Sequence, residues 1–101
     1  MFYNVLKAED LVNLDGEKFK KEKLLENGTG CFGIAAIKKD EIIDTHTSAE
    51  DAAVYVLDGE IEIHFDAEKF TLDKGKIIMF KKDSEHKVLA KKDSKFFIIK
   101  I

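Results

Sequence analysis

Short apolar runs separated by turn residues recur along the whole chain, and this pattern restricts its fold more than any other feature. The runs are too short for ordinary helices and are rich in β-branched and aromatic residues. Proline is absent, so the sharp turns between the runs must be made by Gly, Asn and Asp. Many short strands with turns between them are typical of an all-β jelly roll or a closed β-barrel.

About eight short antiparallel strands are predicted from this pattern. They cover residues 31–37, 41–46, 52–57, 60–65, 69–72, 76–80, 86–90 and 95–101. Asp58 and Gly59 predict a tight hairpin between strands 52–57 and 60–65, because primed hairpin turns need residues that accept a positive φ. Residues 8–11 read as one helical turn. Residues 17–26 stay ambiguous, since Glu, Lys and Leu favour a helix whereas a weak alternation favours a strand.

Length and charge narrow the range of functions. A chain of 101 residues corresponds to one domain, here residues 1–101. Its net charge is −3, it has no arginine and its lysines are interleaved with acids, so no nucleic-acid partner is expected. No apolar run approaches the roughly 20 residues of a membrane span and no signal peptide opens the chain, so no membrane partner is expected. The single Cys31 cannot form an internal disulfide, and a cytoplasmic location is the simplest inference.

Two stretches resemble the two sequence motifs of the cupin superfamily. The first, HTSAEDAAVYVLDG, covers residues 46–59, and the second, GKIIMFKKDSEH, covers residues 75–86. In the first stretch, His46 and Ser48 stand at the two histidine positions of the motif, and Ala52 stands at its glutamate position. The spacing of the motif is therefore kept, while part of its chemistry is replaced.

The second stretch keeps the motif histidine at His86. Lys81 stands at its proline position, Asp83 at its glycine position and Ala90 at its asparagine position. The two motifs and the strands between them span about half the chain. The resemblance implies a small single-domain cupin, which is a jelly roll or conical β-barrel open at one end and often a homodimer.

The resemblance also implies a ligand pocket around His46, Ser48, Ala52 and His86. Of the four residues that usually hold a metal in this superfamily, only His46 and His86 are kept. Strand alternation would place Asp44 on the same face as His46, so its carboxylate is a candidate third ligand. Two imidazoles with one carboxylate would suit a divalent metal such as Zn, Fe, Mn or Ni, whereas two imidazoles alone make a weak site.

The other polar residues give weaker signals. Glu50 and Asp51, in the loop before strand 52–57, are alternative sources of a third metal ligand. His64 lies on the polar face of strand 60–65 and is expected to be exposed to solvent. Cys31 is expected to pack within its apolar strand, because no base lies near it in the sequence.

Three functions are left open by the sequence, because the cupin fold does not fix a reaction. The first is binding of a small organic ligand in an apolar cavity that carries two imidazoles. The alternative is a divalent-metal-dependent enzyme, of oxygenase or isomerase type, with a reduced ligand set. The third is a mainly structural homodimer whose interface is the apolar strand 96–101. The sequence identifies no ligand, metal, reaction or pathway.

Overall fold

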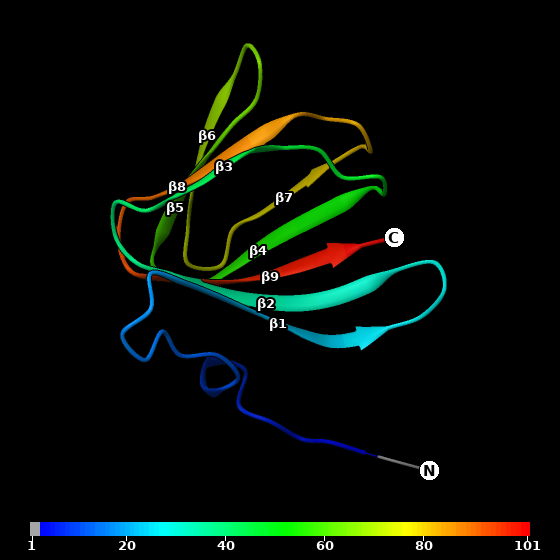
Figure 1. Cartoon of the computed structure of the whole chain (residues 1–101), viewed down its shortest axis with the longest axis vertical. Helices are drawn as coiled ribbons and strands as arrows, with labels where there is room; N and C mark the ends of the chain where they lie inside the picture. Colours follow the sequence, from blue (N-terminus) through cyan, green and yellow to red (C-terminus); the bar gives the residue numbers. More distant parts are fainter. Residues whose placement is uncertain (1–2) are drawn as a thin grey trace.

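The computed structural model describes residues 3–101, which form nine strands and one short 3-10 turn (Figure 1). The 3-10 turn is Ala8–Asp10. The strands are β1 (Phe19–Glu26), β2 (Cys31–Ile37), β3 (Ile42–His46), β4 (Ala52–Asp58), β5 (Glu60–His64), β6 (Lys69–Asp73), β7 (Ile77–Phe80), β8 (His86–Ala90) and β9 (Ser94–Lys100). The all-β prediction is confirmed. The ninth strand is β1, which the sequence had left ambiguous.

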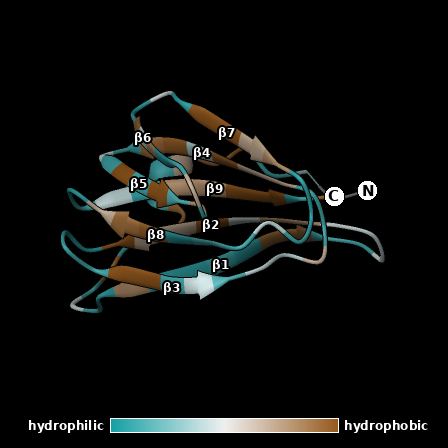
Figure 2. Cartoon of the chain, turned by 90° about the horizontal axis from the view of Figure 1, so that it is seen from above, coloured by the Kyte–Doolittle hydropathy of each residue, from teal (hydrophilic) through white to brown (hydrophobic). Residues whose placement is uncertain are grey.

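Two antiparallel sheets form the walls of the jelly roll. Sheet A has the order β1-β2-β9-β4-β7, and sheet B has the order β3-β8-β5-β6. The sheets face each other, and strands of both sheets contain strongly hydrophobic stretches (Figure 2). Apolar side chains from both sheets form one core. The buried core consists of Ala35, Ile37, Val54, Val56, Ile61, Ile63, Leu72, Val88, Ala90 and Phe96. Strand β9 lies between β2 and β4 and is apolar on both faces, because Phe96 packs in the core and Phe97 packs with the cluster around Val12 on the outer face.

Strand β1 forms although its residues favour a helix. It pairs with β2 from Phe19 opposite Ile37 to Glu26 opposite Cys31, so tertiary pairing overrides helix propensity. Asn27 stabilises the connecting turn, because its Oδ1 accepts a hydrogen bond from the Gly30 backbone N–H at 2.9 Å. β1 is an edge strand, and its many Lys and Glu side chains disfavour pairing with the edge of another molecule.

The hairpin predicted at Asp58 and Gly59 is wrong. Strand β4 pairs with β7 and β9, whereas β5 pairs with β6 and β8, so the chain passes here from one sheet to the other. Gly59 has a φ of 91°, as the turn signal required. The buried Ser94 fixes this corner, since its Oγ accepts a hydrogen bond from the Glu60 N–H at 2.9 Å and donates one to the Lys92 carbonyl at 2.7 Å.

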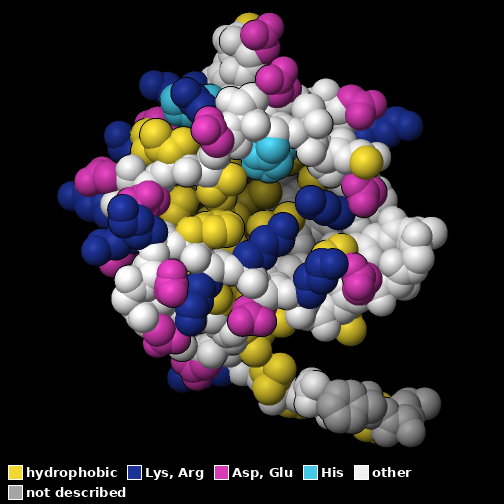
Figure 3. All heavy atoms as spheres, viewed as in Figure 1, with side chains coloured by type: hydrophobic (Ala, Val, Ile, Leu, Met, Phe, Trp, Pro, Cys, Tyr) yellow, Lys and Arg dark blue, Asp and Glu magenta, His cyan; other side chains and the backbone are white. Residues whose placement is uncertain are grey.

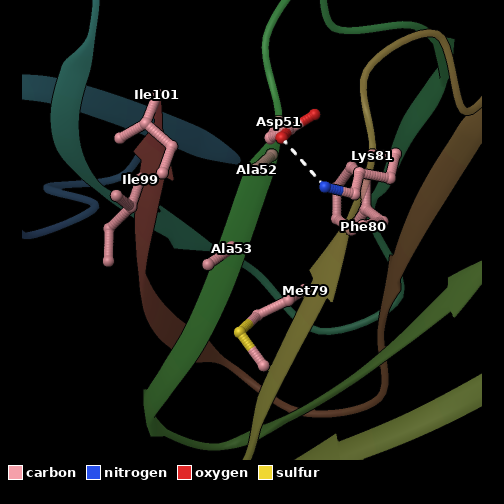
Figure 4. A pocket seen from close by; sticks show the side chains of 8 residues that line it. All are labelled: Asp51, Ala52, Ala53, Met79, Phe80, Lys81, Ile99 and Ile101. Carbon is pink, nitrogen blue, oxygen red and sulfur yellow. Dashed lines mark hydrogen bonds and ion pairs between the residues drawn. The ribbon is translucent and has the colours of Figure 1, made fainter.

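The outer face of sheet A is only partly covered. Val12 of the N-terminal segment is buried against Ile34 and Ala36 on this face. Beside β7 and the end of β9, the same face carries a groove of about 290 Å³ (Figure 4). We call it the outer groove; it is lined by Asp51, Ala52, Ala53, Met79, Phe80, Lys81, Ile99 and Ile101. Within residues 3–101, no helix is both long and apolar enough to cross a membrane.

Candidate functional site

A cavity of about 80 Å³ lies between the two sheets, and we call it the barrel cavity. Its lining residues are Phe19, Lys21, Ile43, His46, Ser48, Ala52, Val54, Phe80, His86, Val88, Phe96, Ile98 and Lys100. The structure therefore brings together all four residues that the sequence placed around a pocket. Figure 3, which has the same view as Figure 1, shows an apolar hollow in the centre of the molecule, with histidine and lysine side chains around its rim.

The two cavity histidines are held in a defined orientation. His46 and His86 are direct partners across β3 and β8, and their ring centroids are 4.2 Å apart. Nδ1 of His46 lies 2.9 Å from the Asp44 carbonyl, and Nδ1 of His86 lies 2.8 Å from the Ser84 carbonyl. Because a carbonyl oxygen only accepts, both Nδ1 atoms must donate. In a neutral ring, Nε2 is then left as a hydrogen-bond acceptor.

The two histidines differ in their exposure. His86 is 6% exposed and lies beside the ring of Phe80, with centroids 4.7 Å apart, whereas His46 is exposed. Burial lowers the pKa of His86, and the positive charges of His46 and Lys100 lower it further, against the opposing effect of the hydrogen bond to Ser84. The neutral form of His86, with an accepting Nε2, is therefore favoured at neutral pH.

Ser48 and Ala52 occupy the other two motif positions without supplying metal donors of the usual kind. Ser48 is buried, and its Oγ accepts a hydrogen bond from the Glu50 backbone N–H at 3.2 Å. Ala52 lies in register with Lys100 on one side and Phe80 on the other, and it contributes only a methyl group to the cavity. With serine and alanine at these two positions, the cavity wall is less polar, and the side chains beside the imidazoles are small.

Asp44 does not line the barrel cavity. The pairing of β3 with β8 is irregular between Ile43 and His46, so both of these side chains reach the cavity although they are an odd number of residues apart. Asp44 is exposed, and its carboxylate accepts a hydrogen bond from the Thr45 N–H at 3.1 Å. Simple alternation therefore does not place these side chains correctly.

The donor set of the cavity does not fit a metal centre well. In the part of the chain that the structure describes, no group of three or more His, Cys, Asp or Glu side chains is arranged to hold a metal ion. Metal sites in proteins usually draw three or more ligands from the chain. His46 and His86 alone would have to be completed by water or by a bound molecule. Ligation by Asp44 stays a prediction that metal analysis can test.

The sequence analysis missed the charged residues of the cavity, Lys21 and Lys100. Lys100 follows Phe96 and Ile98 on the inner face of β9, so strand alternation contained the signal. Lys21 had no such signal, because both faces of β1 are charged, and only its register opposite Ala35 turns it towards the cavity. Partial burial lowers the pKa of the Lys21 amine, and the positive charge of Lys100 lowers it further.

Hydrogen bonds connect the loop before β8, in the second motif, to the segment 48–51 of the first motif. Asp83 stands at the position of a motif glycine and has a φ of 66°, a conformation that Asp tolerates better than most residues. Its N–H donates a hydrogen bond of 2.9 Å to the Ser48 carbonyl. Asp51 acts nearby, since its Oδ1 accepts a hydrogen bond of 2.9 Å from the Lys82 N–H. Asp51 lines the outer groove rather than the barrel cavity.

His64 and Cys31 lie outside the barrel cavity. His64 is half-buried, with 27% of its side chain exposed, rather than fully exposed as expected. Its Nε2 lies 3.0 Å from Oε1 of Glu62, and this hydrogen bond lowers the pKa of the Glu62 carboxyl. Cys31 is half-buried at the start of β2. Neither residue contributes to the arrangement around His46 and His86.

A two-sheet jelly roll in which two histidines of β3 and β8 face a common cavity defines the class of small cupin-fold proteins. The sequence profile of the cupin domain matches residues 33–100, and the chain belongs to this family. No curated protein matches the sequence.

Solved structures show the same fold. A cupin superfamily protein from Desulfitobacterium hafniense is 18% identical with a TM-score of 0.91, over 100% of this chain and 93% of that one. A protein of unknown function from Streptococcus pyogenes is 21% identical with a TM-score of 0.80, over 100% and 95% of the two chains. A cupin 2 conserved barrel domain protein from Leptotrichia buccalis is 26% identical with a TM-score of 0.85, over 92% of this chain and 45% of that one.

Proposed function

We propose that this protein binds a small organic molecule in the barrel cavity, with His46 and His86 as its hydrogen-bonding groups. The observation that carries the proposal is the pair of imidazoles, each fixed through Nδ1 by a backbone carbonyl, on one wall of a mainly apolar cavity. Small-ligand sites combine apolar walls with a few oriented polar groups. The volume of about 80 Å³ is several times the roughly 10–15 Å³ that one water needs, and it suits a small molecule rather than a polymer.

A thermal-shift screen of small organic molecules tests this proposal. Ala52→Leu extends a side chain into the barrel cavity, whereas Ala53→Leu adds the same atoms to the outer groove and is the matched control. We expect compounds that stabilise the wild type and Ala53→Leu but not Ala52→Leu. Compounds that stabilise Ala52→Leu as well as the wild type would place binding elsewhere and overturn the proposal. A His46→Gln variant, altered at an exposed position, provides a second test in which binding should weaken.

A divalent-metal-dependent enzyme is the alternative function. It is supported by the close imidazole pair, because an Nδ1–H bonded to a carbonyl is the arrangement that orients histidine ligands for metal binding through Nε2. It is disfavoured because, among residues 3–101, no third His, Cys, Asp or Glu side chain joins them in a metal-binding arrangement. Elemental analysis of protein purified without chelator, beside the His46→Ala/His86→Ala double variant, decides between the two. A stoichiometric metal that disappears in the double variant would favour the enzyme.

A further inference from the structure

The barrel cavity has basic groups on two opposite walls. His46 and His86 come from sheet B, and Lys21 and Lys100 come from sheet A. Among the lining residues no aspartate or glutamate is present. The rest of the lining is aliphatic, aromatic or hydroxyl-bearing. The cavity is therefore a small apolar space with positive charge on one side and no carboxylate among its lining residues.

Neither lysine is neutralised elsewhere in the described chain. Among residues 3–101, no carboxylate lies within ion-pairing distance of the amine of Lys21 or Lys100, although seven other lysines pair with carboxylates. Glu26 and Glu50 line a neighbouring hollow that includes both lysines, but they have other partners. Glu26 pairs with Lys23 at 2.7 Å. Glu50 accepts a hydrogen bond from Ser48 Oγ at 3.5 Å.

Two unpaired amines beside an apolar cavity disfavour the empty state. Each amine repels the other, and although Lys21 is exposed on edge strand β1, the buried part of its side chain lowers the pKa of its amine. An anion at this position would pair with both amines, while its apolar part could pack on Val54, Phe96 and Ile98. Binding of an anion therefore relieves a repulsion that is present in the free protein.

We propose that the molecule bound in the barrel cavity is a short-chain organic carboxylate, held at its acid group by Lys21 and Lys100. This inference rests on the proposed function and names the class of its ligand. A carboxylate is favoured over a phosphate because the lining residues lie on or beside strands, so that no helix N-terminus among residues 3–101 is available to the ligand. The accepting Nε2 atoms of the opposite wall suit a ligand that also carries a hydroxyl group.

Calorimetric titration with two ligands of the same shape tests the charge requirement. Butyrate and butyramide have nearly equal size, and only butyrate is charged. We expect butyrate to bind at least about tenfold more tightly than butyramide, as charge-assisted hydrogen bonds imply. We expect 3-hydroxybutyrate to bind more tightly than butyrate. Inorganic phosphate at the same ionic strength is the control for non-specific anion binding, and preferential binding of phosphate would contradict the assignment to a carboxylate.

Variants of Lys21 and Lys100 test whether their amines contact the carboxylate group of the ligand. Lys21→Met and Lys100→Met keep an unbranched apolar side chain and remove the charge, and each should weaken butyrate binding about tenfold while leaving butyramide binding unchanged. Lys87→Met is the matched control, because Lys87 follows His86 on β8, does not line the cavity and forms no ion pair within residues 3–101. Circular dichroism and thermal unfolding confirm that each variant is folded.

Failure of this inference is distinguishable from failure of the proposed function. If butyrate and butyramide bind equally, lose binding in Ala52→Leu and keep it in both lysine variants, the cavity binds organic molecules and the carboxylate assignment is overturned. If neither carboxylate binds at millimolar concentration, the assignment is also overturned, and the broader screen decides the proposed function separately. Binding of butyrate that survives in Ala52→Leu would contradict both.

Discussion

His86 is the residue at which burial and charge act most strongly on the cavity. Its pKa lies below the ordinary value of 6.5, because burial disfavours the imidazolium and the nearby positive charges add to this effect. A histidine whose pKa is lowered in the folded state contributes stability above its unfolded pKa and loses it as the pH falls through its folded pKa. Acidification should therefore destabilise the fold through this residue.

Urea unfolding at about pH 8 and at about pH 5 measures this effect, since unperturbed histidine titrates within that range. The free energy of unfolding of the wild type should fall as the pH is lowered. In His86→Gln, which cannot become charged, the fall should be smaller. An equal pH dependence of the two proteins would show that His86 carries no lowered pKa. Chelator-treated samples of both proteins remove any contribution from metal binding.

The sequence predicted the residues of the cavity better than their geometry. The motif spacing indicated His46, Ser48, Ala52 and His86, and these side chains do line one cavity. Asp44 was suggested by strict alternation, which fails because β3 is irregular before His46. Such an irregularity depends on pairing with β8, so no local pattern contained it.

Gly59 is the critical residue at the level of the strands, because it connects the two sheets. A Cβ added there would collide with the Oγ and Cα of Ser94 and with the Asp93 carbonyl. Gly75 has a similar φ of 88°, but an added Cβ there would meet nothing within 4 Å. Comparing alanine substitutions at Gly59 and Gly75 therefore separates the energetic cost of the backbone conformation from the cost of the close contact with Ser94.

Gly75→Ala should lower the free energy of unfolding by about 1–3 kcal/mol, the cost of a non-Gly residue in this conformation. Gly59→Ala should cost about 1–3 kcal/mol more, because the corner must also move away from Ser94. Urea unfolding monitored by circular dichroism measures both values. Equal destabilisation by the two substitutions would mean that the close approach at the corner contributes nothing.

Individual strands were predicted well where one face is buried, and less well where pairing decides the outcome. Strand β5 alternates as expected, with Ile61 and Ile63 buried. Helix propensity could not settle β1, because its conformation is imposed by pairing with β2. Asp58 and Gly59 correctly indicated a turn, yet the partners of β4 and β5 lie far away in the sequence. Local signals fix where a strand ends but do not fix which strand it joins.

At the scale of the whole molecule, the outer face of sheet A remains partly open to solvent. Met79 is 74% exposed and Ile77 is 49% exposed, beside the outer groove. Exposed apolar patches of this kind are typical of protein interfaces. We expect a second copy of the chain to cover this face, so that the outward-facing residues of β9 contribute to a homodimer.

Sedimentation equilibrium tests the homodimer. The wild type should be dimeric at micromolar concentration, and Met79→Lys should shift it towards monomer by placing a charge in the apolar interface. Ile42→Lys is the control, because Ile42 is 56% exposed but lies on β3 of the opposite sheet, sheet B. A monomeric wild type, or a Met79→Lys variant that dimerises as tightly as the wild type, would contradict this prediction.

The most direct test of the central claim is to locate a bound ligand by amide NMR. The competing site for such a ligand is the outer groove of about 290 Å³, which is larger than the barrel cavity of about 80 Å³. When the best compound of the screen is added, the account predicts that shift changes will concentrate around His46, His86 and Val88, and that they will be lost in Ala52→Leu. Shift changes confined to Met79 and Ile101, and unaffected by Ala52→Leu, would contradict a ligand-binding role for the barrel cavity.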